Sequence, residues 1–245
     1  NSFSSHGYDL VLPPLVEFEE SLLIGPGKAH SRNMFRLLDP ASQRMMGVRT
    51  DMTGQVARIS HSRLGNAPRP LRLSYAGDVL RIKGTQLRPE RQFKQAGVEL
   101  IGSNSTEAYT EIILLGYEAL KNVGAKNLSV DLALPQLVPA ICKGLKIDDE
   151  LSALLRRALD GKNIAELSNI KGDIGNISRS LLEAAGPAPK CLDIINGLKL
   201  PEAAAEMCAE LSKLVARLAE IAPDLMVTVD PGEYTGFEYQ TGISF

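Results

Sequence analysis

The chain has 245 residues, of which 44% are hydrophobic and 23% charged, an ordinary composition for a globular protein of one large domain or a domain with an insertion. Its formal net charge is −2, so no basic excess favours nucleic-acid binding. No apolar run approaches the ~18 residues of a membrane span and no signal pattern opens the chain, so we expect a cytoplasmic protein without membrane contact.

The beginning of the chain is expected to be extended, because Tyr8, Leu10 and Leu12 share one side of an alternating pattern. Pro13–Pro14 interrupts this pattern, and a helix over residues 15–23 is expected to follow. Several strands and two helices come next. In chain order these are strands over 34–38 and 45–49, a helix capped by Thr53, strands over 71–82 and 92–101, a helix capped by Asn104, and a strand over 128–134.

The character of the chain changes after Pro139, where short helical signals dominate. Asp148 or Asp149 is expected to cap one helix, Asn176 or Ser178 to open another, and Pro187 and Pro189 to form a stiff link. We therefore predict a helical insertion over residues 139–197. The core would then comprise residues 1–138 and 198–245.

A long amphipathic helix is expected after Pro201, with an apolar stripe from Ala204 to Ile221 that suits a core position better than a partner surface. A strand over 226–229 follows. Strands that come first in antiparallel runs, with helices packed to one side, predict an α+β fold rather than an alternating α/β fold.

Familiar catalytic and metal-binding motifs are absent from the sequence. The three cysteines Cys142, Cys191 and Cys208 lie far apart, so neither a metal site nor a disulfide framework is expected. The stretch from Gly25 to Lys28 lacks the spacing of a phosphate loop, and Gly172–Gly175 follows no strand. We expect no catalytic residues and no cofactor.

The stretch Arg91–Gly102 carries more information. In a strand, Gln95, Gly97 and Glu99 would point to the same face. Two polar side chains flanking a glycine suit a small polar ligand, because the glycine leaves room for it. The alternative is a solvent-exposed strand face, which antiparallel sheets often have.

The stretch from Arg49 to Thr53 repeats this pattern. If it is extended, Arg49, Asp51 and Thr53 share a face, where a carboxylate and a hydroxyl can hold an ammonium group. The alternative is that Asp51 or Thr53 caps the next helix, and one residue can do both.

These segments resemble the class II aminoacyl-tRNA synthetases of the histidyl type. Pro13–Pro14 with Glu17 is similar to the first motif of that class, and Arg81 followed by Arg91–Gly102 to the second. The stretch Gly236–Ile243 is similar to the histidine-binding signature. The resemblance covers most of the chain in the correct order and implies an antiparallel sheet flanked by helices.

The resemblance also implies roles for individual residues. Asp51, Thr53 and Gln95 would hold the α-amino group of histidine, and Glu99 would bind an imidazole nitrogen. Arg81 stands where an arginine normally contacts the ATP α-phosphate, so it is a candidate phosphate or carboxylate contact. The full histidine-binding set carried over is Asp51, Thr53, Gln95, Gly97, Glu99, Tyr239 and Gln240.

Four departures from the synthetase pattern concern the chemistry. Thr235 stands at the signature arginine and Lys83 at an acidic residue of the second motif, while Asp51 is a shortened acidic residue and Gln240 replaces a tyrosine. Loss of the signature arginine removes stabilisation of the reacting carboxylate and phosphate. Histidine binding can survive these changes, whereas we expect adenylate formation to be lost.

This combination resembles the ATP phosphoribosyltransferase regulatory subunits, paralogues of the synthetases that do not charge tRNA. The resemblance implies a short-form catalytic subunit as partner, feedback by L-histidine, and a homodimer core within a hetero-oligomer. Two alternatives remain. One is an active histidyl-tRNA synthetase core, and the other is an unrelated amino-acid sensor or synthetase-like interaction module. The synthetase would need further domains beyond Phe245. Because the chain opens at Asn1 and ends in an apolar run, we expect the native protein to extend further.

Overall fold

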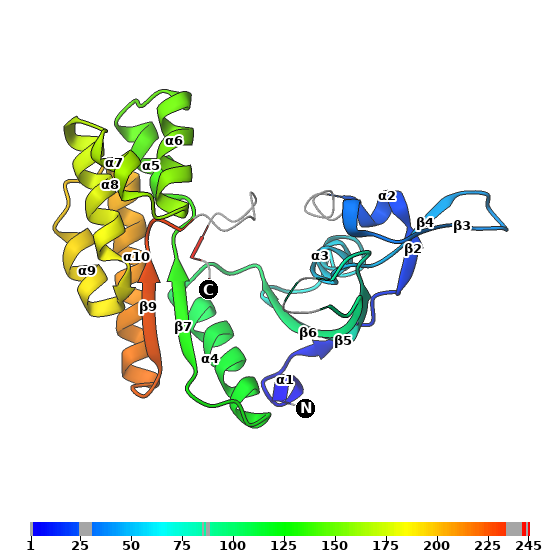
Figure 1. Ribbon diagram of the computed structural model, residues 1–245. Coiled ribbons are helices and arrows are strands. Elements are labelled where there is room, and N and C mark those ends of the chain that lie inside the picture. Colours follow the sequence, from blue (N-terminus) through cyan, green and yellow to red (C-terminus); the bar gives the residue numbers. More distant parts are fainter. Residues whose placement is uncertain (1, 25–30, 85, 87–88, 234–241, 244) are drawn as a thin grey trace. The chain divides into compact units, whose positions relative to one another are not determined.

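The structure is a computed structural model (Figure 1). The residues that it describes are 2–24, 31–84, 86, 89–233, 242–243 and 245. The chain folds as two compact units, Asn1–Asn104 and Ser105–Phe245. The segment expected as an insertion, 139–197, lies inside the second unit, and its assignment as a separate subdomain stays a prediction.

The main sheet of the first unit is a long antiparallel pair, β5 (Leu71–Leu80) and β6 (Gln92–Ile101), with the short β1 (Asp9–Leu10) parallel to β5. The two long strands confirm the sequence prediction to within two residues. Helix α3 (Thr53–Ser62) packs against this sheet. The buried apolar residues of this unit's small core are Met52, Val56, Leu73, Tyr75 and Val79.

A second sheet in this unit has the order β2-β4-β3 and is antiparallel throughout. Its strands are β2 (Val16–Phe18), β3 (Arg36–Leu38) and β4 (Met45–Val48), and the remaining helices of the unit are α1 (Ser2–Ser5) and α2 (Glu19–Leu22). The helix expected over 15–23 is therefore wrong in its first half. Val16 and Phe18, a β-branched and an aromatic residue, pair with β4 instead, and only a single helical turn follows.

The second unit contains the sheet β7-β9-β8 and most of the helices (Figure 1). Its strands are β7 (Ser129–Ala133), β8 (Gly186–Pro187) and β9 (Met226–Asp230). Its helices are α4 (Thr106–Asn122), α5 (Leu137–Gly144), α6 (Asp149–Asp160), α7 (Ile164–Ser168), α8 (Gly172–Ala184), α9 (Ala188–Asn196) and α10 (Glu202–Ile221). The α+β class is confirmed, although β7 and β9 pair in parallel.

Helix boundaries in the second unit follow local hydrogen bonding. Asp148 caps α6 as expected, with its Oδ1 accepting from the Leu151 N–H at 2.8 Å. Helix α4 is capped by Ser105 rather than Asn104, because the Ser105 hydroxyl reaches the Ala108 N–H at 3.2 Å.

Two further expectations about the second unit are wrong. Helix α8 begins at Gly172, one turn before the predicted openers. The proline link is instead the short β8 and the first turn of α9, where a proline costs no hydrogen bond.

Helix α10 forms the centre of the second unit's core. Most of its predicted stripe is buried, with Ala204, Leu211, Leu214 and Leu218 fully enclosed in the core, whereas Ile221 at the end of the helix is 45% exposed, so the stripe ends one turn earlier than expected. Within the described residues, no helix is long and apolar enough to cross a membrane. The same residues hold no cluster suited to a metal ion, and the three cysteines are buried free thiols.

Candidate functional site

The candidate site lies on the inner face of the β5–β6 sheet, in the first unit. Along β6, Gln95, Gly97 and Glu99 are partly buried, whereas Lys94 and Ala96 on the other face are exposed. The shared face of the first three residues is thus confirmed, and it is the covered face of the sheet. The alternative of a solvent-exposed strand face is wrong for these residues.

Two hydrogen bonds of the Gln95 side chain join the segment before α3 to the sheet. Its side-chain Oε1 accepts from the Met52 N–H at 3.0 Å, and its Nε2 donates to Asp51 Oδ2 at 2.6 Å. The other Asp51 oxygen accepts from the Thr53 N–H at 2.7 Å. Asp51 therefore forms a local turn before the helix and joins the polar cluster. The N-cap of α3 is Met52, without a side-chain cap, so the expected capping by Asp51 or Thr53 is wrong.

A second set of hydrogen bonds connects Thr53, Tyr75 and Glu99. The Thr53 and Tyr75 hydroxyl oxygens lie 3.1 Å apart, and the Tyr75 O–H donates to Glu99 Oε1 at 3.2 Å. The structure thus brings Asp51, Thr53, Gln95 and Glu99 together in one cluster around Tyr75. Their binding of histidine stays a prediction.

Tyr75 is the member of the cluster that the sequence reasoning missed. It stands opposite Gly97 in the β5–β6 register, and a Cβ on Gly97 would come 2.5 Å from the Tyr75 hydroxyl oxygen. The space beside Gly97 is therefore filled by the tyrosine ring, which corrects the expectation that it is left for a ligand. An aromatic residue opposite a glycine in two long paired strands was the available signal.

Arg49 does not belong to the cluster. Strand β4 ends at Val48, so the stretch from Arg49 to Thr53 does not continue as a strand, and the shared face expected for Arg49 is wrong. The buried Arg49 guanidinium instead donates to the Pro13 carbonyl at 2.5 Å and the Asp78 carbonyl at 2.8 Å. It ties together backbone segments that frame the sheet.

Burial dominates the electrostatics of Glu99. Desolvation raises the pKa of the Glu99 carboxyl above its usual range, and the nearby Asp51 carboxylate adds to the rise. Hydrogen bonds from Thr53 and Tyr75 act in the opposite direction because they favour the ionised form. A partly buried carboxylate held by two hydroxyls is suited to accept hydrogen bonds from a polar ligand.

Comparison with known proteins assigns the chain to a family. The family model for histidyl-tRNA synthetase matches residues 1–245. The chain belongs to the histidyl-tRNA synthetase family. The resemblance expected from Arg81, the Arg91–Gly102 stretch and the signature is thereby confirmed.

Curated relatives narrow the comparison. Proteins of Rhodospirillum centenum and Paramagnetospirillum magneticum are 50% and 53% identical over 243 residues, which is 99% of this chain. Both carry the name ATP phosphoribosyltransferase regulatory subunit. The chain spans 63% and 64% of their lengths.

Solved structures agree on the fold. A Bacillus halodurans protein described as an ATP phosphoribosyltransferase regulatory subunit/histidyl-tRNA synthetase matches with a TM-score of 0.84 and 28% identity, over 99% of this chain and 64% of its own. A chain of the ATP phosphoribosyl transferase complex of Thermotoga maritima matches with a TM-score of 0.71 and 17% identity, over 99% and 81%. The expected synthetase-like fold is confirmed.

The remaining predicted site residues are Arg81, Tyr239 and Gln240. Arg81 follows β5, where its guanidinium lies over the Phe93 ring at 5.0 Å from the centroid. Its Nε is buried without a hydrogen-bond partner in the described part of the chain, and its role as a phosphate contact stays a prediction. Tyr239 and Gln240, together with Thr235, lie outside the described residues.

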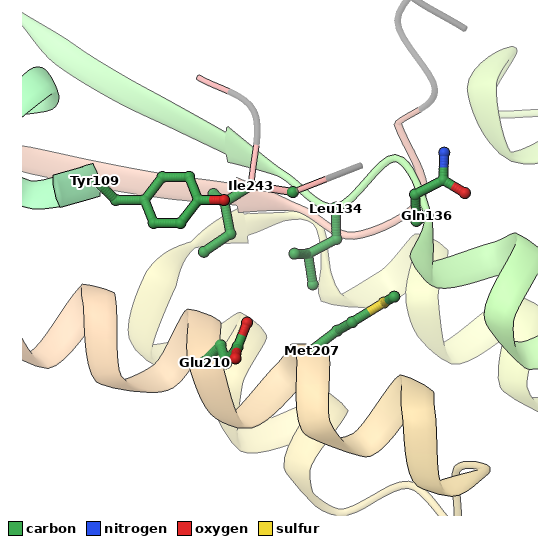
Figure 2. Close-up of a pocket in the computed structure, with 7 residues that line it drawn as sticks. Tyr109, Leu134, Gln136, Met207, Glu210 and Ile243 are labelled. Carbon is green, nitrogen blue, oxygen red and sulfur yellow. The ribbon is translucent and has the colours of Figure 1, made fainter. Parts of the chain in front are cut away.

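Gly242 and Ile243, the described end of the stretch expected to be the histidine-binding signature, line a cavity in the second unit. This cavity contains about 310 Å³ of space, part of it open to solvent. It is lined by Tyr109, Leu134, Gln136, Met207, Glu210, Gly242 and Ile243. Figure 2 shows Tyr109, Ile243 and Leu134 on one side, with Met207 and Glu210 on α10 facing them. A Cβ on Gly242 would collide with the Tyr109 hydroxyl, so a larger residue here would require the tyrosine side chain to shift.

Proposed function

We propose that this chain is the synthetase-like part of an ATP phosphoribosyltransferase regulatory subunit and that its first unit binds free L-histidine for feedback control. The observation that carries the proposal is the polar cluster on the β5–β6 sheet, in which Asp51, Gln95 and Glu99 converge. Carboxylates beside a hydroxyl and an amide suit an ammonium group and a ring N–H. The names of relatives that are about half identical support the same assignment.

The absence of synthetase chemistry is supported by the sequence. Lys83 and Thr235 stand where the synthetase pattern has an acidic residue and an arginine. An arginine that stabilises charge developing during adenylate formation acts mainly in the transition state, so its loss lowers the rate far more than substrate affinity. A pocket without these groups is suited to sense histidine rather than to activate it.

The proposed partner is a short-form ATP phosphoribosyltransferase catalytic subunit, taken from what the names of the relatives imply. A homodimer core is supported by the apolar N-terminal segment, where Leu10, Leu12 and Leu15 are 60%, 76% and 41% exposed. Exposed leucines grouped in this way favour burial against another chain. A cytoplasmic location belongs to the same proposal.

The deciding experiment combines two assays on the full-length protein. Calorimetry is expected to show L-histidine binding, and a pyrophosphate-exchange assay with ATP is expected to show no histidine-dependent signal. Mixing with a short-form catalytic subunit is expected to restore phosphoribosyltransferase activity that histidine inhibits. Robust pyrophosphate exchange would instead show an active synthetase, and absence of histidine binding would contradict the sensor.

The site is tested by Glu99→Ala in the reconstituted complex. Removing the carboxylate leaves the ligand N–H and two cluster hydroxyls without their acceptor, so we expect at least about a 30-fold loss of histidine affinity and loss of feedback. The matched control is Glu150→Ala on α6, an exposed glutamate outside the first unit. Retained feedback in the first variant with intact folding would place the effector site elsewhere.

A further inference from the structure

Tyr75 has a central place in the polar cluster. The residue is only 5% exposed, and its ring occupies the space that Gly97 leaves open on the neighbouring strand. Its hydroxyl lies within hydrogen-bond distance of both Thr53 and Glu99. A buried hydroxyl between two polar side chains fixes which of them can still donate a hydrogen bond.

The protons in this part of the cluster can be assigned one by one. An ionised carboxylate only accepts, so the single Tyr75 O–H is used on Glu99. Because the Tyr75 proton is used on Glu99, the Tyr75 oxygen, 3.1 Å from the Thr53 hydroxyl oxygen, accepts the Thr53 proton. Thr53 and Glu99 then keep only acceptor sites for a ligand.

We propose that Tyr75 is a positioning residue that fixes this polarity, so that the Thr53–Glu99 end of the cluster takes ligand groups that donate hydrogen bonds and rejects groups that only accept. The inference rests on the proposed histidine-binding function and adds what sets its selectivity. A ligand that lacks the matching N–H would leave a buried carboxylate unpaired, which is a strong basis for discrimination.

Tyr75 also maintains the charge that this selectivity requires. Burial and the Asp51 carboxylate favour the protonated form of Glu99, whereas the hydrogen bond from Tyr75 favours the ionised form. Among the described residues, the titratable groups that face Glu99 are Tyr75 on β5 and Asp51 before α3. Since Asp51 acts equally in a Tyr75 variant, a change in the titration of Glu99 would report the lost hydroxyl.

The test is Tyr75→Phe in the full-length protein, which keeps the ring that fills the space beside Gly97. At neutral pH we expect about 10-fold weaker L-histidine binding by calorimetry, because Glu99 loses the hydroxyl that orients it and favours its ionised form. Nuclear magnetic resonance of the labelled Glu99 carboxyl should show its titration at higher pH than in the wild type. As pH is lowered, the histidine affinity of Tyr75→Phe should therefore begin to fall at a higher pH than that of the wild type. The ligand's own titration is the same for both proteins.

Selectivity gives a further readout. The wild type should bind at least one of the two ring-methylated histidines about 100-fold more weakly than L-histidine. In Tyr75→Phe the ratio of these two affinities should be smaller. The control is Tyr117→Phe on α4, which should alter neither affinity nor titration. If Tyr75→Phe does not fold, Thr53→Val must produce the same upward shift of the Glu99 titration.

The possible failures can be told apart. If the wild type does not bind histidine, the proposed function fails. If it binds and the variant retains the affinity, the Glu99 titration and the ligand ratio of the wild type, only the role of Tyr75 is overturned.

Discussion

The two units of this chain differ in what their interiors are made of. The second unit has a large apolar core in which α10 buries leucines against its neighbouring helices. The first unit has a small core, one of whose members is Tyr75, and the sheet face that it covers also carries Gln95 and Glu99. Polar groups at such positions contribute less burial of apolar surface, so the second unit has the larger share of the apolar core and the first unit carries the proposed binding surface.

The largest expected effect is in the apolar core of the second unit. Leu211 on α10 is fully buried, so Leu211→Ala is expected to cost about 2–5 kcal/mol of unfolding free energy through lost burial and a cavity. Denaturant unfolding measures the loss, and hydrogen exchange should place it in α4 and α10. Leu120→Ala, a half-exposed leucine on α4, is the control. Equal costs for both variants would contradict the description of this core.

The stability of the first unit should depend most on the buried Arg49 guanidinium. Arg49→Met keeps much of the side-chain volume but leaves the Pro13 and Asp78 carbonyls without their buried donor, at an expected cost of about 1–3 kcal/mol. Hydrogen exchange should rise in β5 and β6 but not in α10. The exposed Arg63→Met serves as the control. A variant as stable as the wild type would show that the first unit does not depend on this anchor.

The elements with a regular hydrophobic pattern could be predicted from the sequence in both units. The long paired strands and the α10 stripe depend on alternation and helical spacing, and these elements were correctly expected. The face shared by Gln95 and Glu99 follows from the same alternation. The stretch 15–23 was misjudged because pairing between distant strands decided the structure of Val16–Phe18.

The details of the site depend on contacts between segments far apart in the sequence. Register places Tyr75 opposite Gly97, and the ring that fills this space is invisible from either strand alone. Arg49 was grouped with Asp51 by spacing, yet β4 ends before Arg49, whose guanidinium is held by carbonyls of two other segments. Local spacing therefore identified Asp51 and Gln95 as neighbours, but it wrongly added Arg49 and missed Tyr75, because tertiary contacts place both.

The smallest expected effect concerns the cost in unfolding free energy of the charge on Glu99. Because burial raises the pKa of Glu99, the folded protein disfavours its ionised form, and Glu99→Gln removes that penalty while keeping the shape of the side chain. We expect the variant to be more stable than the wild type at neutral pH by about 0.5–2 kcal/mol, and to lose histidine binding. The gain should shrink as pH falls through the raised pKa and vanish below about 4.3, where the wild-type carboxyl is protonated in both the folded and unfolded states. Denaturant unfolding of both proteins at several pH values measures this, with Glu150→Gln as the control. If the stability difference between Glu99→Gln and the wild type stayed constant with pH, the charge of Glu99 would not be the cause of the stability cost.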